Sequence, residues 1–106
     1  YVIFDKYPVS KGHSLIIPKR HVADYFETSL NEKISLQLLL EEAQKTIKAK
    51  FNPEGFNIGV NIGNHAGQTV NHVHIHLIPR YENDVPDPIG GVRNIIPGKG
   101  NYLRNK

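Results

Sequence analysis

The chain has 106 residues with a formal net charge of +3, a length that suits a single domain and leaves no room for a second. Its mild basic excess suits an anionic ligand but lacks the dense basic clusters of a dedicated nucleic-acid binder. Because the sequence contains no cysteine, it excludes a disulfide framework, a cysteine-ligated zinc site and a thiol nucleophile among these residues.

The first part of the chain predicts two strands. Residues Tyr1–Asp5 are apolar and aromatic, and His13–Ile17 is apolar again. Between them, Lys6–Gly12 contains a proline, a serine and a glycine, which are typical of a connection. We therefore expect a strand, a connection and a second strand.

A long helix is predicted next. Ser29 and Glu32 have the spacing of a capping box, so the helix should begin near Leu30. It should end near Lys50, because the segment Asn52–Gly55 contains asparagine, proline and glycine. The apolar stripe that we expect this helix to bury consists of Leu30, Ile34, Leu38 and Ile47, with Leu39 and Ala43 beside it.

The second half of the chain changes to a strand-like period. Residues Phe56–Ile62 alternate apolar side chains with asparagine and glycine, which predicts a half-buried strand. A turn or loop over Gly63–Gly67 precedes another alternating strand over Thr69–Ile78. The last stretch, Glu82–Lys106, has three prolines and four glycines and few apolar residues. We expect one domain over residues 1–106 with this stretch as a tail draped on it.

Three histidines lie in the last predicted strand. His72, His74 and His76 alternate with apolar residues, so in a strand they point to one face while the apolar residues point into a core. Three interpretations are open: a solvated strand face, a metal site, or nucleophilic catalysis on phosphorus. Catalytic zinc usually needs a third ligand, and no carboxylate lies between Glu54 and Glu82. We favour nucleophilic catalysis and predict no metal site.

The residues before the histidines support a phosphate ligand. Asn61, Gln68 and Thr69 offer neutral hydrogen-bonding groups, and Gly67 lets the backbone approach a ligand closely. Taken without the histidines, the same residues are better explained as ordinary turn residues. His21 and His65 are explained adequately by surface or capping roles.

The segment Gly67–Arg80 resembles the signature of the histidine triad family of nucleotide hydrolases and transferases, in which three histidines alternate with apolar residues. The upstream segment Ser10–Lys19 resembles the second landmark of that family. The resemblance implies an α+β fold, with an antiparallel sheet of about five strands, one long helix packed on it, and pairing as a homodimer. Some members carry a Cys-x-x-Cys zinc site completed by histidines that resemble His21 and His72, which a chain without cysteine does not supply.

The resemblance also implies roles for individual histidines. His74 matches the nucleophile, which attacks the α-phosphorus and forms a nucleotidyl-histidine that water then hydrolyses. His76 would lie near the bridging or leaving oxygen. His72 and His13 would form the hydrogen-bonded set that orients the other two.

Further positions match the ligand-binding residues of the family. Asn61, Gln68 and Thr69 would hold phosphate oxygens. Asp5 matches the position that binds the ribose hydroxyls, although capping a turn would also explain it. The apolar positions that would enclose the base are Ile3 and Leu15, which are as readily explained as ordinary strand core.

The sequence favours one branch of the family. A histidine at the third triad position, His76, disfavours the nucleotidyltransferases, which have glutamine there, and Leu77–Arg80 is closer to the dinucleoside polyphosphate hydrolases. We therefore expect hydrolysis of the α-phosphate linkage of a purine nucleotide derivative such as a diadenosine polyphosphate. The alternatives are an adenosine phosphoramidase and a nucleotide-binding module with weak activity. A DNA-adenylate hydrolase is disfavoured because that branch usually carries a zinc finger.

Cofactors, partners and location are also expectations. No cofactor is required by this chemistry, although Mg²⁺ would accompany a polyphosphate substrate. The partners expected are the nucleotide and a second copy of the chain, without nucleic acid or membrane. No apolar run approaches the roughly 20 residues that span a bilayer, and a signal pattern is lacking, so we expect a soluble cytoplasmic protein. The chain opens at Tyr1 without a methionine, so we expect its natural start to lie upstream.

The predicted tail carries a second set of basic residues. They either reach a second phosphate or nucleoside or remain solvated, and we favour solvation. This set consists of Arg93, Lys99, Arg104 and Lys106.

Overall fold

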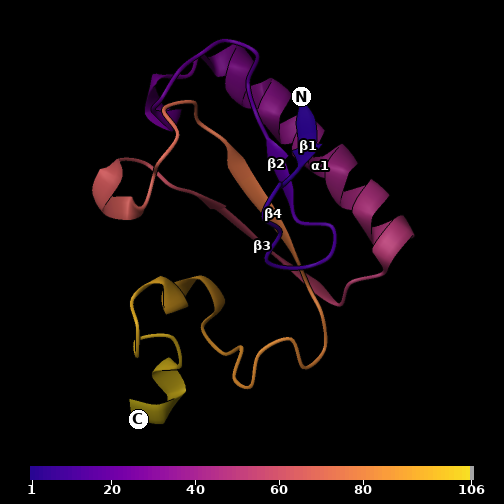
Figure 1. Ribbon diagram of the computed structural model, residues 1–106, viewed down its shortest axis with the longest axis vertical. Helices are drawn as coiled ribbons and strands as arrows, with labels where there is room; N and C mark the ends of the chain where they lie inside the picture. Colours follow the sequence, from indigo (N-terminus) through magenta and orange to yellow (C-terminus); the bar gives the residue numbers. More distant parts are fainter. Residues whose placement is uncertain (106) are drawn as a thin grey trace.

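The computed structural model describes residues 1–105, and its core is one antiparallel sheet covered by one long helix (Figure 1). The strand order is β1-β2-β4-β3. This confirms the predicted α+β class and the single long helix, with four strands in place of about five. The elements are β1 (Val2–Phe4), β2 (Ser14–Ile16), α1 (Leu30–Phe51), β3 (Gly55–Val60) and β4 (Ile75–Arg80).

The register of the sheet determines which residues share a face with His76 of the central strand β4. His76 pairs with Leu15 of β2 on one side and with Gly59 of β3 on the other. Leu15 in turn pairs with Ile3 of β1. Because directly paired residues share a face, these residues form a row across the sheet, on the face that carries the histidines.

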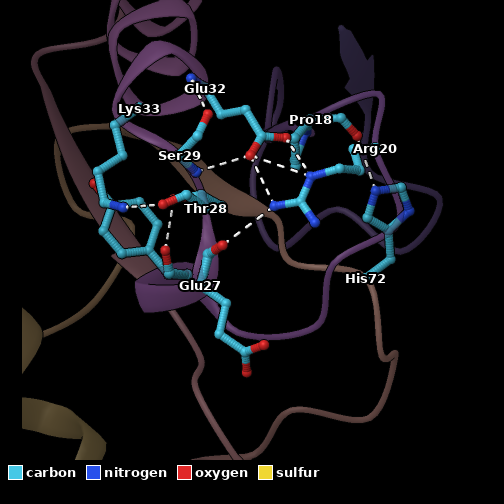
Figure 2. A network of polar contacts seen from close by, with 9 residues as sticks. Pro18, Arg20, Glu27, Thr28, Ser29, Glu32, Lys33 and His72 are labelled. Carbon is cyan, nitrogen blue, oxygen red and sulfur yellow. Dashed lines mark hydrogen bonds and ion pairs between the residues drawn. The ribbon is translucent and has the colours of Figure 1, made fainter.

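The start of α1 follows the predicted capping box. The Ser29 hydroxyl accepts a hydrogen bond from the Glu32 backbone N–H at 3.1 Å, and the Glu32 carboxylate accepts one from the Ser29 N–H at 2.8 Å. Arg20, four residues after the end of β2, forms an ion pair with the same carboxylate at 2.8 Å (Figure 2). At the other end, Asn52 adopts a left-handed conformation with a φ of 51°. The predicted helix is therefore confirmed, with one further residue at its C-terminus.

The predicted buried stripe of α1 is wrong over its first half. Leu30, Ile34 and Leu38 are 72%, 50% and 60% exposed. The reason is that apolar residues occupy adjacent positions in this helix, so two stripes fit the helical period. The stripe that packs on the sheet consists of Leu36, Leu40, Ala43 and Ile47, of which the last two were predicted to be buried or to lie beside the stripe.

The strand predicted over Thr69–Ile78 is shorter and displaced. β4 begins at Ile75, because Val73 donates its backbone N–H to the Val22 carbonyl at 2.7 Å instead of joining the sheet. The strand continues through Pro79, which pairs with Phe56 of β3. A proline is accommodated there because β2 pairs with β4 only as far as Leu77, which leaves one side of Pro79 without a partner strand.

The C-terminal segment lies on the side of the sheet opposite α1 (Figure 1). It contains two short 3-10 helices, η3 (Gly91–Ile95) and η4 (Tyr102–Asn105), and the first of them contacts β3. Arg93 donates to the Gly100 carbonyl, and Arg104 pairs with Asp87 at 3.2 Å. Two of the basic residues of the predicted tail therefore hold the segment together, while Lys106 lies outside the described residues.

Candidate active site

His74 has one ring nitrogen committed to the backbone. Its Nδ1 lies 3.0 Å from the His72 carbonyl oxygen, which can only accept a hydrogen bond. Nδ1 therefore carries the proton, and in a neutral imidazole the lone pair is on Nε2. In a neutral His74, Nε2 is therefore the ring nitrogen whose lone pair is available to a ligand.

A second backbone group determines the protonation of His13 and His76. The Val9 backbone N–H donates to His13 Nδ1 at 3.1 Å, so a neutral His13 carries its proton on Nε2. His13 Nε2 lies 2.9 Å from His76 Nδ1 and donates to it. His76 then carries its own proton on Nε2, where it is free to donate to a ligand.

The loop that supplies the Val9 amide is attached to the sheet. Ser10 donates its hydroxyl to the Pro79 carbonyl at 2.7 Å, and Tyr81 donates its hydroxyl to the Lys11 carbonyl at 2.6 Å. Sequence reasoning did not assign these residues to the site, because hydrogen bonds to backbone groups leave no characteristic spacing.

Burial keeps His13 and His76 neutral. His13 is 3% exposed, and this burial lowers its pKa below 6.5, opposed by the charge of Asp5. Burial also lowers the pKa of His76, and the neighbouring His74 and His13 lower it further against the opposing Asp5. Both side chains are therefore uncharged at neutral pH, as the hydrogen-bonded chain requires.

Asp5 follows β1 and contacts His13. One carboxylate oxygen lies 3.4 Å from His13 Nε2, and the other accepts the Tyr7 backbone N–H at 2.9 Å. The predicted ribose contact of Asp5 stays a prediction. Its contact with His13 is an additional one that sequence reasoning missed.

His72 is separated from the other supporting histidine. Its Nε2 donates to the Pro18 carbonyl at 2.8 Å (Figure 2), and its ring centroid lies 5.0 Å from that of His21. The prediction that His72 and His13 form one hydrogen-bonded set is therefore corrected. The chain bends before β4 begins, and the His72 imidazole bonds to Pro18 instead. His72 contributes to His74 through its backbone carbonyl, not through its imidazole.

The contacts of Gln68 also differ from those that the sequence predicts. It is 8% exposed, its oxygen accepts the Gly63 N–H, and its amide nitrogen donates to the Ala23 and Val70 carbonyls. Both amide protons are thus used to fold the loop, so in this conformation Gln68 has none to donate to phosphate, contrary to expectation. Asn61 and Thr69 are exposed at the two ends of the same loop, and their phosphate contacts stay predictions.

The apolar positions predicted to enclose the base lie beside the histidines. Leu15 is half-buried and pairs with His76, and Ile3 pairs with Leu15 and is 45% exposed. The two side chains therefore provide an accessible apolar surface next to His76. Neither belongs to the buried core that packs against α1.

Asp5, His13 and His76 also have the composition of a metal site. One potential ligand atom from each lies within 4.8 Å of the others. A histidine that binds a metal usually donates its second ring N–H to an acceptor. His13 Nδ1 instead receives the Val9 N–H and cannot carry a proton there. The contacts of the two His13 ring nitrogens therefore fit a chain of hydrogen bonds and do not fit a metal bound to His13 Nε2.

Comparison with known proteins connects this geometry to a family. The HIT domain model matches residues 1–83, which contain every side chain of this candidate site. The chain belongs to the HIT family. This confirms the resemblance of the triad to that family.

Similar HIT proteins include enzymes named for dinucleoside polyphosphates. The chain is 33% identical to AP-4-A phosphorylase of Mycobacterium tuberculosis (strain H37Rv), over 79% of the chain and 44% of that protein. It is 39% identical to bis(5'-adenosyl)-triphosphatase of Dictyostelium discoideum, over 73% of the chain and 52% of that protein. The chain thus spans about half the length of these curated relatives.

Solved HIT structures have the same fold. A HIT family protein from Bacillus anthracis is 43% identical with a TM-score of 0.75, over 78% of this chain and 59% of that one. A zinc-bound histidine triad family protein from Mycobacterium smegmatis is 31% identical with a TM-score of 0.72, over 81% and 67%. These structures place the described sheet and helix among HIT domains.

Proposed function

We propose that this HIT domain hydrolyses the α-phosphate linkage of a purine nucleotide derivative such as a diadenosine polyphosphate, through a nucleotidyl adduct on His74. The observation that carries the proposal is the hydrogen bond from His74 Nδ1 to the His72 carbonyl. It leaves the Nε2 lone pair available on the face that also presents the His76 Nε2–H. The named activities of the similar enzymes support the choice of substrate.

The first step forms a P–N bond and breaks a P–O bond. His74 Nε2 attacks the α-phosphorus, and the electron pair of the broken bond leaves on the polyphosphate oxygen. The His76 Nε2–H donates a hydrogen bond to that oxygen as its charge develops. The adduct is cationic on the imidazole because Nδ1 keeps its proton, which makes the imidazole a good leaving group in the next step.

The second step reverses the bond to the imidazole. Water attacks the phosphorus, the P–N electron pair returns to His74 Nε2, and the proton lost by water is released to solvent. The products are a mononucleotide, the remaining nucleoside polyphosphate and a proton. Two moderate barriers thus replace a single difficult displacement.

The state of His76 favours a polyphosphate over a phosphoramidate. An amine must gain a proton as it leaves, whereas a polyphosphate leaves as a stable anion. Burial and its neighbours lower the pKa of His76, so at neutral pH it has no excess proton to give. A hydrogen bond from its Nε2–H is sufficient for the anionic leaving group.

The test is to measure hydrolysis of diadenosine tetraphosphate and adenosine 5'-phosphoramidate separately. We expect faster turnover of the tetraphosphate, complete loss in His74→Ala, and unchanged turnover in the control His65→Ala, whose side chain is exposed outside the site. Turnover of the phosphoramidate alone would assign the domain to P–N hydrolysis. Nucleotide binding without turnover of either substrate would make it a binding module.

The assembly and the accompanying ion belong to the same proposal. We propose a cytoplasmic homodimer, with Mg²⁺ bound by the polyphosphate substrate as its counter-ion. The resemblance to the family supports the dimer, and sedimentation at equilibrium tests it. Within the described residues, no helix is both long and apolar enough to cross a membrane.

A further inference from the structure

A cavity lies between the sheet and the C-terminal segment, on the face that carries the histidines. Its volume is about 490 Å³. The sheet contributes Asn57, Ile78 and Arg80, and the segment that follows β4 contributes Asp84, Val85 and Asp87. The loop after β1 closes one side with Val9. The comparisons and the family roles described above leave this cavity unassigned.

The cavity adjoins the leaving-group side of the triad. Ile78 follows His76 by two residues on β4, so it lies on the same face about 7 Å farther along the strand. Val9 lines the cavity and also donates its N–H to His13, which in turn contacts His76. A leaving group that accepts a hydrogen bond from His76 therefore reaches the cavity when it extends along β4 away from His74.

The charges of the cavity do not suit a phosphate chain. Arg80, the cation among its described lining residues, donates to the Asp84 carboxylate at 2.7 Å and to the Asn57 side chain. Asp87 supplies a second carboxylate and is paired with Arg104 at 3.2 Å. Both carboxylates are thus paired with an arginine, and the described lining offers a polyanion no unpaired cation. A neutral ligand is therefore favoured over an anionic one.

The remaining surface has the chemistry of a nucleoside site. Val9, Ile78 and Val85 offer apolar area to a base. The Asp87 carboxylate accepts bonds from Asn101 and from the Ile89 N–H, and a carboxylate has further lone pairs for hydroxyl donors. An apolar wall with a few fixed polar groups is typical of small-molecule sites.

We propose that this cavity binds the second nucleoside of a dinucleoside polyphosphate, the one that departs with the leaving polyphosphate. The inference rests on the proposed function and deepens it. It makes the C-terminal segment a determinant of specificity, because that segment supplies one wall of the cavity. Substrates that lack the second nucleoside make no contact with this wall.

The test compares two substrates that differ only in the second nucleoside, diadenosine tetraphosphate and adenosine 5'-tetraphosphate. Val85→Trp fills the cavity, and Val92→Trp is the matched control, since Val92 is 57% exposed on the same segment and is not among the residues that line the cavity. We expect Val85→Trp to raise KM for diadenosine tetraphosphate by about tenfold or more, the equivalent of about 1.4 kcal/mol. KM for adenosine 5'-tetraphosphate should remain unchanged, which also shows that the variant folds.

The outcomes separate this inference from the function on which it rests. Equal changes in KM for both substrates, or no change for either, would overturn the second-nucleoside site while leaving the hydrolase intact. The same effect in Val92→Trp would also overturn it. If the wild-type protein hydrolyses neither tetraphosphate, the proposed function fails and this inference fails with it.

Discussion

At the scale of residues, the site depends on which nitrogen of each imidazole carries the proton. Two backbone groups decide this: the His72 carbonyl for His74, and the Val9 amide for His13 and, through it, His76. Neither group depends on the side chain of the residue that supplies it. The Val9 side chain itself is 71% exposed.

Removing the Val9 amide proton tests this relay. Val9→Pro has no N–H to donate to His13, so His13 and His76 are free to exchange tautomers. We expect kcat to fall roughly tenfold to a hundredfold with little change in KM, because a correctly protonated donor contributes about 10²–10⁴-fold. The pH profile of kcat should also change shape.

Val9→Ala is the matched control, because it keeps the amide and should keep the wild-type kcat, while its smaller side chain affects only KM for a substrate that occupies the cavity. Nitrogen chemical shifts of His13 report the tautomer directly. A protonated Nδ1 in the wild-type protein, or equal rates for Val9→Pro and Val9→Ala, would refute the role of the amide.

The lowered pKa values of His13 and His76 predict a loss of stability in acid. In the unfolded chain these histidines titrate near 6.5, so below about pH 6.5 the unfolded state takes up protons that the folded state does not. The free energy of unfolding should therefore be constant above that pH and fall below it. Urea unfolding at about pH 7.5 and about pH 5.5 measures the difference.

Replacing one of these histidines should reduce that pH dependence. His13→Gln should lose less stability between the two pH values than the wild-type protein does, whereas the exposed His65→Gln should lose as much. A full wild-type decrease in His13→Gln would show that another group is responsible.

The sequence points to the candidate triad residues more directly than to the contacts that they make. The alternation of His72, His74 and His76 identifies the triad, because the residue types themselves carry the chemistry. The Val9 amide has no sequence signature, since every residue except proline has an N–H. The loop contacts of Gln68 also have no sequence signature, because the same amide group serves equally well to bind phosphate and to close a loop.

At the scale of elements, α1 shows what the apolar periodicity of a sequence can predict and what it cannot. The capping box and the asparagine after the helix were readable as short, local signals. The buried face was not, because Leu36 and Leu38–Leu40 offer apolar side chains in several directions. Only packing against β2 and β4 selects between the stripes.

Alanine substitutions should distinguish the two stripes. Leu36 is 2% exposed, so Leu36→Ala should destabilise the fold by about 2–5 kcal/mol through lost packing. Leu38 is 60% exposed, so Leu38→Ala should change stability by no more than about 0.5 kcal/mol in the monomer. Denaturant unfolding measures both, and equal losses would contradict the observed orientation of α1.

The helix cap gives a second prediction at this scale. Ser29→Ala removes the acceptor for the Glu32 N–H and should lower the free energy of unfolding by about 1 kcal/mol. Ser35→Ala, at an exposed position within the same helix, is the control and should be neutral or slightly stabilising. A cost at Ser35 equal to that at Ser29 would exclude capping as the cause.

At the scale of the whole molecule, the strand order assembles the site from distant parts of the chain. β2 lies directly beside β4, so His13 and His76 meet although 63 residues separate them, and β1 adds Asp5. The sequence contains no direct sign of these distances. The resemblance to the HIT family predicted the sheet. The cavity beside the C-terminal segment could not be predicted in this way, because part of its lining lies beyond the matched residues.

The attack of His74 on phosphorus is tested most directly by the intact mass of the protein during turnover. The protein is mixed with diadenosine tetraphosphate and quenched in base, where a phosphorus–nitrogen bond to histidine survives. We expect an added adenylyl group in the wild-type protein and none in His74→Ala. An adduct that persists in His74→Ala, or turnover by that variant at the wild-type rate, would contradict it.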